Sequence, residues 1–323
     1  MTRLDRLFPF EVRFALAFVG LTLVLAERLG VGIVLPGPGQ ADFIGMHYLF
    51  PLVGLALWAA ALALLSKQHP GPVILVGLPC YAVVMLAHFN IKLWVPDLNP
   101  RLYDESYWQI DQALRPLVDG AMALRQLLNG IIPADSAFYT HGFIAMFYFG
   151  FTVHGLQRVE VFRALIIASM SLQALGALAY LVAPAVGPFI FEQGTNPFFT
   201  GVQREMLASY QEHLAQGPSW VVAHGDAMLL TGLAAMPSLH AGGSFLFVLF
   251  AWRHCRQVAL LPTVMFGFIC IAAIANRWHY LIDLPAGMLL AWCCAYLGEK
   301  VAGLRGSLAG RPAVPSPLRP VPA

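Results

Sequence analysis

The sequence predicts an all-α, polytopic integral membrane protein of about eight transmembrane helices. Of its 323 residues, 59% are hydrophobic and only 11% are charged, which is far from the balance of an average soluble domain. The apolar residues gather in runs of about 20, the length that crosses a bilayer core of roughly 30 Å. Pro, Gly and charged residues separate the runs.

Eight such runs can be followed along the chain. We expect the first two to be additional N-terminal helices within residues 1–70, and the last six to form a membrane domain over 71–302. The sixth run is short, and the first carries two charged residues near its end. The runs lie at approximately 14–35, 47–66, 72–89, 137–155, 162–186, 237–252, 258–275 and 279–298.

Two long loops and a tail lie outside these runs. The loop at 91–136 mixes aromatic, acidic and Leu-rich stretches, which indicates short amphipathic helices at the membrane surface. The loop at 188–236 is long enough for a lid or a cap over a binding site. The segment 303–323 is rich in Pro and lacks an apolar face, so we expect a flexible cytoplasmic tail.

The placement of basic residues predicts the orientation in a cell membrane. Lys and Arg concentrate in cytoplasmic segments. If the N-terminus is cytoplasmic, most of the 19 Lys and Arg residues also lie on the cytoplasmic side. Both termini are then cytoplasmic. The inner residues are Arg3, Arg6, Arg13, Lys67, Arg158, Arg163, Arg253, Arg256, Lys300, Arg305, Arg311 and Arg319.

Four polar residues beside the last apolar runs are the candidates for chemistry. Asp283 lies inside a predicted span, where an ionised carboxylate costs on the order of 2.5–3.5 kcal/mol and is expected to be paired. His279, four residues earlier, would share its helix face. Spans six and eight both start on the outer side, which predicts that Ser238 and His240 lie at the same depth as His279.

Such a group can carry out nucleophilic and acid–base chemistry, and these residues alone do not single out phosphate as the substrate. A carboxylate that holds one imidazole nitrogen leaves the other free as nucleophile or base, and a second, protonated histidine can donate to a leaving oxygen. Ser238 and backbone N–H groups at a helix start can hold an anion. Taken singly, His240 or Asp283 could equally be an interhelical hydrogen bond.

The motifs "MPSLHAG" and, about 40 residues later, "HYLIDLPAG" resemble the second and third signature motifs of the phosphatidic acid phosphatase type 2 superfamily. Together with the upstream "LVAPAVGPFIF" they look most like the branch of inositol phosphorylceramide synthases and their bacterial relatives. The resemblance covers roughly 136–298. It implies a six-helix catalytic core whose site opens on the outer side.

Carried over residue by residue, the resemblance implies that His279 attacks phosphorus to form a phosphohistidine. Asp283 would orient His279, His240 would protonate the departing oxygen, and Ser238 would bind the phosphoryl group. The partners implied are a lipid in the bilayer and an acceptor that is a small alcohol or a lipid, with no nucleic acid. The family chemistry needs no cofactor and no metal.

The sequence departs from the broad family at the basic residues that hold phosphate. We find no basic residue followed by an Arg-Pro pair before span six, and Ala273 stands where the third motif usually has Arg. The transferase branch relaxes the same motifs. Arg277 is therefore the leading candidate for a phosphate-binding cation, although it could also be an interfacial anchor, and Arg204 is a weaker one.

Three functions remain open at this point. The first is a phosphotransferase that hands a phosphoryl or phospho-headgroup unit to an alcohol such as inositol or a lipid hydroxyl. The second is a lipid phosphatase, in which water resolves the same intermediate. The third is a transporter in which Asp283, His240 and His279 relay protons or coordinate a metal. A serine hydrolase is disfavoured because Ser238 lacks a G-x-S-x-G context.

Overall fold

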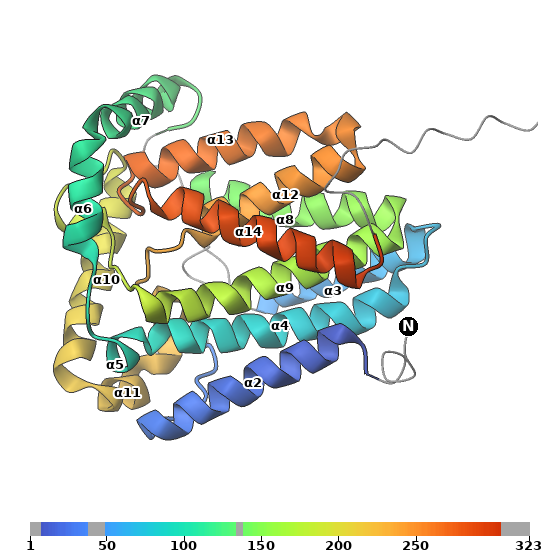
Figure 1. Cartoon of the computed structure of the whole chain (residues 1–323), viewed down its shortest axis with the longest axis horizontal. Helices are drawn as coiled ribbons and strands as arrows, with labels where there is room; N and C mark the ends of the chain where they lie inside the picture. The colour runs from blue at the N-terminus through green and yellow to red at the C-terminus, as the bar shows by residue number, and fades with distance from the viewer. Residues whose placement is uncertain (1–7, 38–48, 134–137, 305–323) are drawn as a thin grey trace, which may run out of the picture.

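The computed structural model describes residues 8–37, 49–133 and 138–304. These residues form helices and connecting turns, with no strand among them. Eight helices run roughly along one direction as a bundle (Figure 1). Their bounds are α2 Phe10–Leu29, α3 Leu49–Leu65, α4 Gly71–Leu93, α8 Phe138–Gln157, α9 Val159–Val182, α12 Leu239–His254, α13 Leu260–Ala275 and α14 Asp283–Val301.

Each of the eight apolar runs corresponds to one of these helices, but several ends differ from the predicted ones. α2 stops at Leu29, not near residue 35, because Gly30 adopts a left-handed conformation with φ 67° and caps the helix. α4 continues four residues past the predicted end, to Leu93. α14 begins at Asp283 rather than at 279, so the expectation that His279 and Asp283 share a helix face is wrong.

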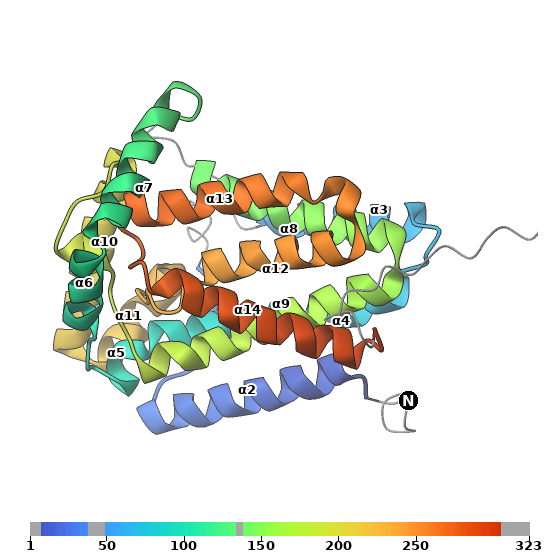
Figure 2. The ribbon, with the colours of Figure 1, turned by 45° about the horizontal axis from the view of Figure 1, so that its top comes forward.

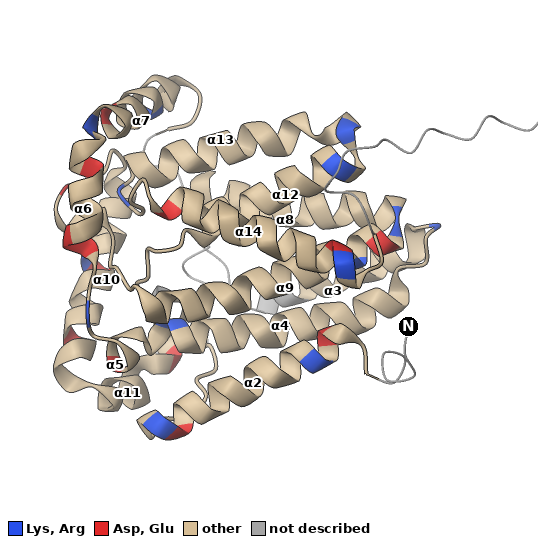
Figure 3. Cartoon of the chain, viewed as in Figure 1, with Lys and Arg blue, Asp and Glu red and all other residues tan. Residues whose placement is uncertain are grey.

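Among the described residues, two helices are long and apolar enough to cross a bilayer, which supports membrane association. These are α4, Gly71–Leu93, and α9, Val159–Val182. Val53–Leu65 and Leu260–Ala275 are apolar but shorter. Figure 3 shows charged residues mainly towards the two ends of the helices, with long uncharged stretches between.

α9 is the central helix of the bundle. It packs against α14, α4, α12 and α8, and most of its side chains, Phe162 and Leu165 among them, are buried. Because a helix that is apolar on all sides needs neighbours on all sides, α9 fixes the positions of the helices around it. α2 packs on the far side of α4.

The two long loops fold as short helices across one end of the bundle (Figures 1 and 2). The first loop gives α5 Val95–Leu98, α6 Asp104–Ala113 and α7 Arg115–Leu127. The second gives α10 Pro197–Gln216 and α11 Pro218–Met228. The helical prediction for 91–136 is thus correct where that loop is described. All but the first two residues of the tail 303–323 lie outside the described residues.

Candidate active site

Ser238 and His240 lie at the start of α12, at the end of the bundle that the short helices cross. Ser238 is the N-cap, and its hydroxyl oxygen accepts a hydrogen bond from the Ala241 amide at 3.2 Å. The Ser238 amide donates to the backbone oxygen of Asp283 at 3.0 Å. This bond ties the first turn of α12 to the first turn of α14.

His279 lies in the turn between α13 and α14, and its ring is held at one nitrogen. Nδ1 is 2.9 Å from the backbone oxygen of Ala235 and 3.3 Å from Oδ2 of Asp283. A carbonyl oxygen can only accept, so Nδ1 carries the proton and Nε2 keeps its lone pair. The same Asp283 oxygen accepts from the Tyr280 amide at 2.8 Å.

The second histidine faces the first. The ring centroids of His240 and His279 are 6.2 Å apart. His240 also packs edgewise against Phe143 and at a tilt against Tyr139, with centroids at 4.7 Å and 5.2 Å. The structure therefore brings Ser238, His240, His279 and Asp283 together from two segments that are about 40 residues apart.

Two glycines of the motifs allow this meeting. A Cβ on Gly287 would overlap the Ser238 carbonyl, and a Cβ on Gly242 would lie 2.7 Å from the Gly287 carbonyl oxygen. Any side chain at either position would push α12 and α14 apart at the level of the histidines. The glycine that ends "MPSLHAG" and the glycine that ends "LPAG" are therefore parts of one helix crossing.

Arg277 is paired with two carboxylates and is therefore not a free cation. Its guanidinium is fully buried, 3.2 Å from Oδ2 of Asp111 and 3.4 Å from Oε2 of Glu192, and its Cζ lies 5.2 Å from the Trp108 ring centroid. Burial lowers the pKa of Arg277, and the two carboxylates oppose that shift. Arg204, the weaker candidate, is exposed on α10.

Lys92 is the basic residue that the sequence analysis missed. It lies in the last turn of α4, beyond the end of the predicted span, with Nζ 6.0 Å from the Tyr180 ring centroid. The loop at Gly232 packs against the Lys92 backbone and leads to Ala235, whose carbonyl oxygen accepts from His279. The sequence signal is a lysine that stands three residues after the end of the apolar run at 72–89.

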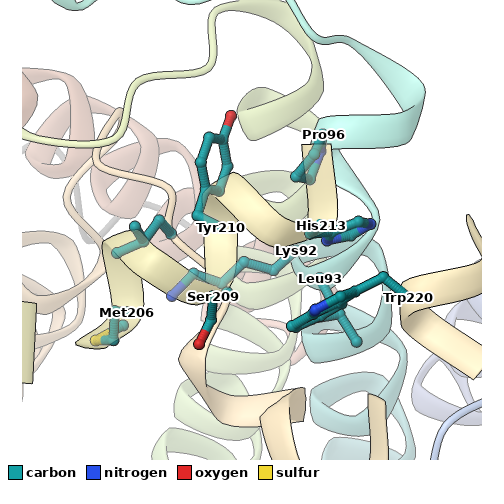
Figure 4. Close-up of a pocket in the computed structure, with 10 residues that line it drawn as sticks. Lys92, Leu93, Pro96, Met206, Ser209, Tyr210, His213 and Trp220 are labelled. Carbon is teal, nitrogen blue, oxygen red and sulfur yellow. The ribbon is translucent and has the colours of Figure 1, made fainter. Parts of the chain in front are cut away.

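Lys92 also lines a small pocket between α4, α10 and α11 (Figure 4). On the far wall, His213 pairs with Asp97 at 2.7 Å and stacks on Trp220 with centroids 4.8 Å apart. The loop that carries Gly232 and Leu233 closes the pocket and leads directly into the Ser238 motif. The pocket is therefore connected to the Ser238 motif through the chain at residues 232–237.

A metal centre is not apparent in the described part of the chain. Among residues 8–37, 49–133 and 138–304, no three or more His, Cys, Asp or Glu side chains are placed to hold one ion. The carboxylates nearest the site act on protein groups instead, as Asp283 does on His279 and Tyr280.

Comparison with known proteins identifies the family. A family model described as the PAP2 superfamily matches residues 131–297, just over half of the chain, including all of α8 to α13 and most of α14. Comparisons with curated proteins and with solved structures gave no match. The superfamily resemblance seen in the motifs is thus confirmed, and it supports a phosphatase or phosphotransferase activity on phosphate esters. The chain belongs to the PAP2 superfamily.

Proposed function

We propose that the protein is a membrane-embedded phosphotransferase that acts on lipid phosphate or phospho-headgroup esters through a phosphohistidine at His279. The acceptor is an alcohol such as inositol or a lipid hydroxyl, as in the inositol phosphorylceramide synthase-like branch. The observation that carries the proposal is the state of His279: Nδ1 is held by Ala235 and Asp283, which leaves Nε2 as a nucleophile beside His240.

The proposal includes a multi-pass arrangement in a cell membrane. All eight bundle helices span the bilayer, both termini are cytoplasmic, and the site opens on the outer side. The common direction of the helices (Figure 1) supports this arrangement, as does the position of both motif histidines at the end opposite to the loops that carry Lys67 and Arg158. α2 and α3 are then additions to a six-helix catalytic core over 71–302.

In the first step, the lone pair of His279 Nε2 attacks phosphorus, the P–N bond forms, and the P–O bond to the leaving group breaks. The electron pair leaves on that oxygen, which takes a proton from protonated His240. The imidazolium that forms at His279 is stabilised by Asp283 through Nδ1–H.

Cations and dipoles hold the phosphoryl oxygens during this step. Lys92, in the last turn of α4, supplies a positive charge, and the start of α12 at Ser238 supplies the positive end of a helix dipole. Ser238 can also donate its hydroxyl proton while its oxygen accepts from Ala241. Arg277 faces Asp111 and Glu192, so we assign phosphate binding to Lys92 in its place.

In the second step, the acceptor hydroxyl attacks phosphorus and gives its proton to neutral His240. The P–N bond breaks, and its electron pair returns to Nε2 of His279. If water takes the place of the alcohol, the same steps release inorganic phosphate, and the protein is a lipid phosphatase. The two functions share every residue and differ only in which hydroxyl reaches the intermediate.

The test is turnover of phosphate-labelled lipids by detergent-purified protein, with and without inositol and other alcohols. His279→Ala is the inactive control, and Ser238→Ala tests the serine alternative. Label on an alcohol that is lost in His279→Ala supports the transferase, and inorganic phosphate alone supports the phosphatase. If no product depended on His279, the phosphohistidine mechanism would be rejected in favour of a transport function.

A further inference from the structure

The helix α6, Asp104–Ala113, carries two buried carboxylates that the proposed chemistry does not use. Asp104 is 4% exposed and Asp111 is fully buried. They are seven residues apart, which places both on one face of the helix. That face lies against the turns that carry the candidate site.

Asp104 joins two loops from distant parts of the chain. Its Oδ2 accepts from the Val186 amide at 2.9 Å, and its Oδ1 accepts from the Gly187 amide at 2.8 Å and from the Tyr280 hydroxyl at 2.7 Å. Tyr280 directly follows His279. Asp104 therefore fixes the loop after α9 against the turn that holds the nucleophile.

Asp111 holds the same turn from its other side. Its Oδ1 accepts from the Leu281 amide at 2.9 Å, and its Oδ2 faces the Arg277 guanidinium at 3.2 Å. Arg277 has φ 56°, a left-handed conformation that an L-residue rarely adopts without outside support. The residues held by the two carboxylates, Arg277, Tyr280 and Leu281, bracket His279.

Burying two carboxylates costs free energy, and a purely structural helix would not need them. Burial raises the pKa of Asp111, although the Leu281 amide and Arg277 oppose the shift. Apolar side chains of similar volume commonly give equal or greater stability than a buried ion pair. What carboxylates add is a defined geometry, because each oxygen fixes the positions of the N–H or O–H groups that donate to it.

We infer that α6 is a strap whose Asp104 and Asp111 are positioning residues for the His279 turn. They act through Tyr280, Leu281 and Arg277 and do not touch the phosphate ester. The inference deepens the proposed function and rests on it, because its readout is the formation of the phosphohistidine.

The experiment compares Asp104→Asn and Asp111→Asn with Glu105→Gln in the full-length, detergent-purified protein. Asn keeps the shape but replaces one acceptor oxygen with an amino group. In Asp104→Asn this group would face a backbone N–H or the tyrosine hydroxyl, and in Asp111→Asn it would face the Leu281 N–H or the Arg277 guanidinium. Glu105 is a matched control because it is on α6, is exposed, and contacts only Gln109 of its own helix among the described hydrogen bonds. Tyr280→Phe removes one Asp104 contact alone.

The measurement is single-turnover labelling of the protein by a phosphate-labelled lipid, followed by steady-state kinetics. A misplaced nucleophile slows labelling without reducing its final extent, whereas a variant that is partly unfolded reduces the extent. We expect Asp104→Asn and Asp111→Asn to slow labelling by roughly 10- to 100-fold with full extent, and to lower kcat with little change in KM. Tyr280→Phe should slow labelling less, and Glu105→Gln should match the wild type.

The outcomes separate this inference from the proposed function. If the wild type labels and His279→Ala does not, but both Asp variants label at the wild-type rate, the strap inference is overturned and the proposed function stands. The same holds if the variants only lose labelling extent, because that result shows a structural role. If the wild type itself gives no His279-dependent label, the proposed function fails first and the inference fails with it.

Discussion

Of the buried histidine–carboxylate pairs in the described part of the chain, two lie at opposite ends of the bundle, and we propose chemistry for only one of these two. At the motif end, His279 Nδ1 is 3.3 Å from Asp283. At the other end, His254 Nε2 is 2.9 Å from Glu299. The residue types are alike, but the surroundings differ.

Glu299 has a partner for each oxygen, since Oε1 faces His254 and Oε2 accepts from Arg253 at 3.1 Å. Asp283 has one oxygen engaged, whereas its Oδ1 has no hydrogen-bond partner within the part of the chain that the structure describes. Each histidine lies near a second imidazole, with ring centroids 6.2 Å apart for His240 and His279 and 6.4 Å apart for His154 and His254. The comparison teaches that a carboxylate whose two oxygens are both paired, one of them with an arginine, suits helix packing. The proposed chemistry belongs to the pair that has no arginine, whose carboxylate keeps one oxygen without a hydrogen bond and whose histidine lies beside the start of α12.

The largest expected difference comes from removing each histidine. His279→Ala should lower turnover by about 10⁴-fold or more, because loss of a nucleophile removes the covalent route. His254→Ala should keep turnover within about twofold. Rates of product release from labelled lipid check both, and equal losses in the two variants would refute the distinction between the pairs.

The carboxylates give the next contrast. Asp283→Asn should lower turnover by about 10³-fold, since it weakens the hold on the Nδ1–H tautomer and on the imidazolium. Glu299→Gln should leave turnover nearly unchanged but destabilise the protein by about 1–3 kcal/mol, because Arg253 and His254 lose a largely buried countercharge. Thermal unfolding in detergent and turnover are measured on the same samples, and an Asp283→Asn variant that is only less stable would contradict the assignment.

Lysines at the two ends offer a third contrast. Lys92→Met should lower kcat/KM by about 10²-fold through loss of a charge that stabilises the phosphoryl oxygens. Lys300 is exposed in the last turn of α14, so Lys300→Met should leave kcat/KM unchanged. The assay is kcat/KM over a range of lipid concentration, and a normal value for Lys92→Met would return the phosphate-binding role to Arg277.

The smallest expected effect tests the helix crossing. Gly287→Ala should lower turnover by roughly tenfold, because the added Cβ meets the Ser238 backbone and separates α12 from α14. Gly267→Ala, on α13, meets nothing within 4 Å and should be neutral or slightly stabilising. Turnover and thermal unfolding of the two alanine variants provide the check, and identical behaviour would show that the crossing tolerates a methyl group.

The helices were predictable from sequence because long apolar runs leave few alternatives to a helix. Their ends were not, because single residues decide them: Gly30 stops α2, and the turn around Arg277 delays α14 until Asp283. The meeting of Ser238, His240, His279 and Asp283 agrees with the expectation from motif spacing and shared orientation, while their chemical roles stay predictions.

Other parts of the site could not be predicted because they depend on contacts far apart in sequence. Asp104 meets Tyr280 across 176 residues, and Asp111 meets Leu281 across 170. Nothing in the local sequence of either acidic residue distinguishes it from Glu105 or Asp119, which are exposed. Likewise, the position of Arg277 near the motif predicts phosphate binding, whereas its partners in the structure come from α6 and from Glu192.

The bond between the Ser238 amide and the Asp283 backbone oxygen has a consequence for biosynthesis. A ribosome releases the α12 motif well before α14, so the nascent chain holds Ser238 and His240 while their partners are still untranslated. The centre can form only after the final helix has been synthesised and has docked at the Gly242–Gly287 crossing. Under the proposed function, a chain shortened before α14 would therefore be inactive, although its sequence contains every earlier helix.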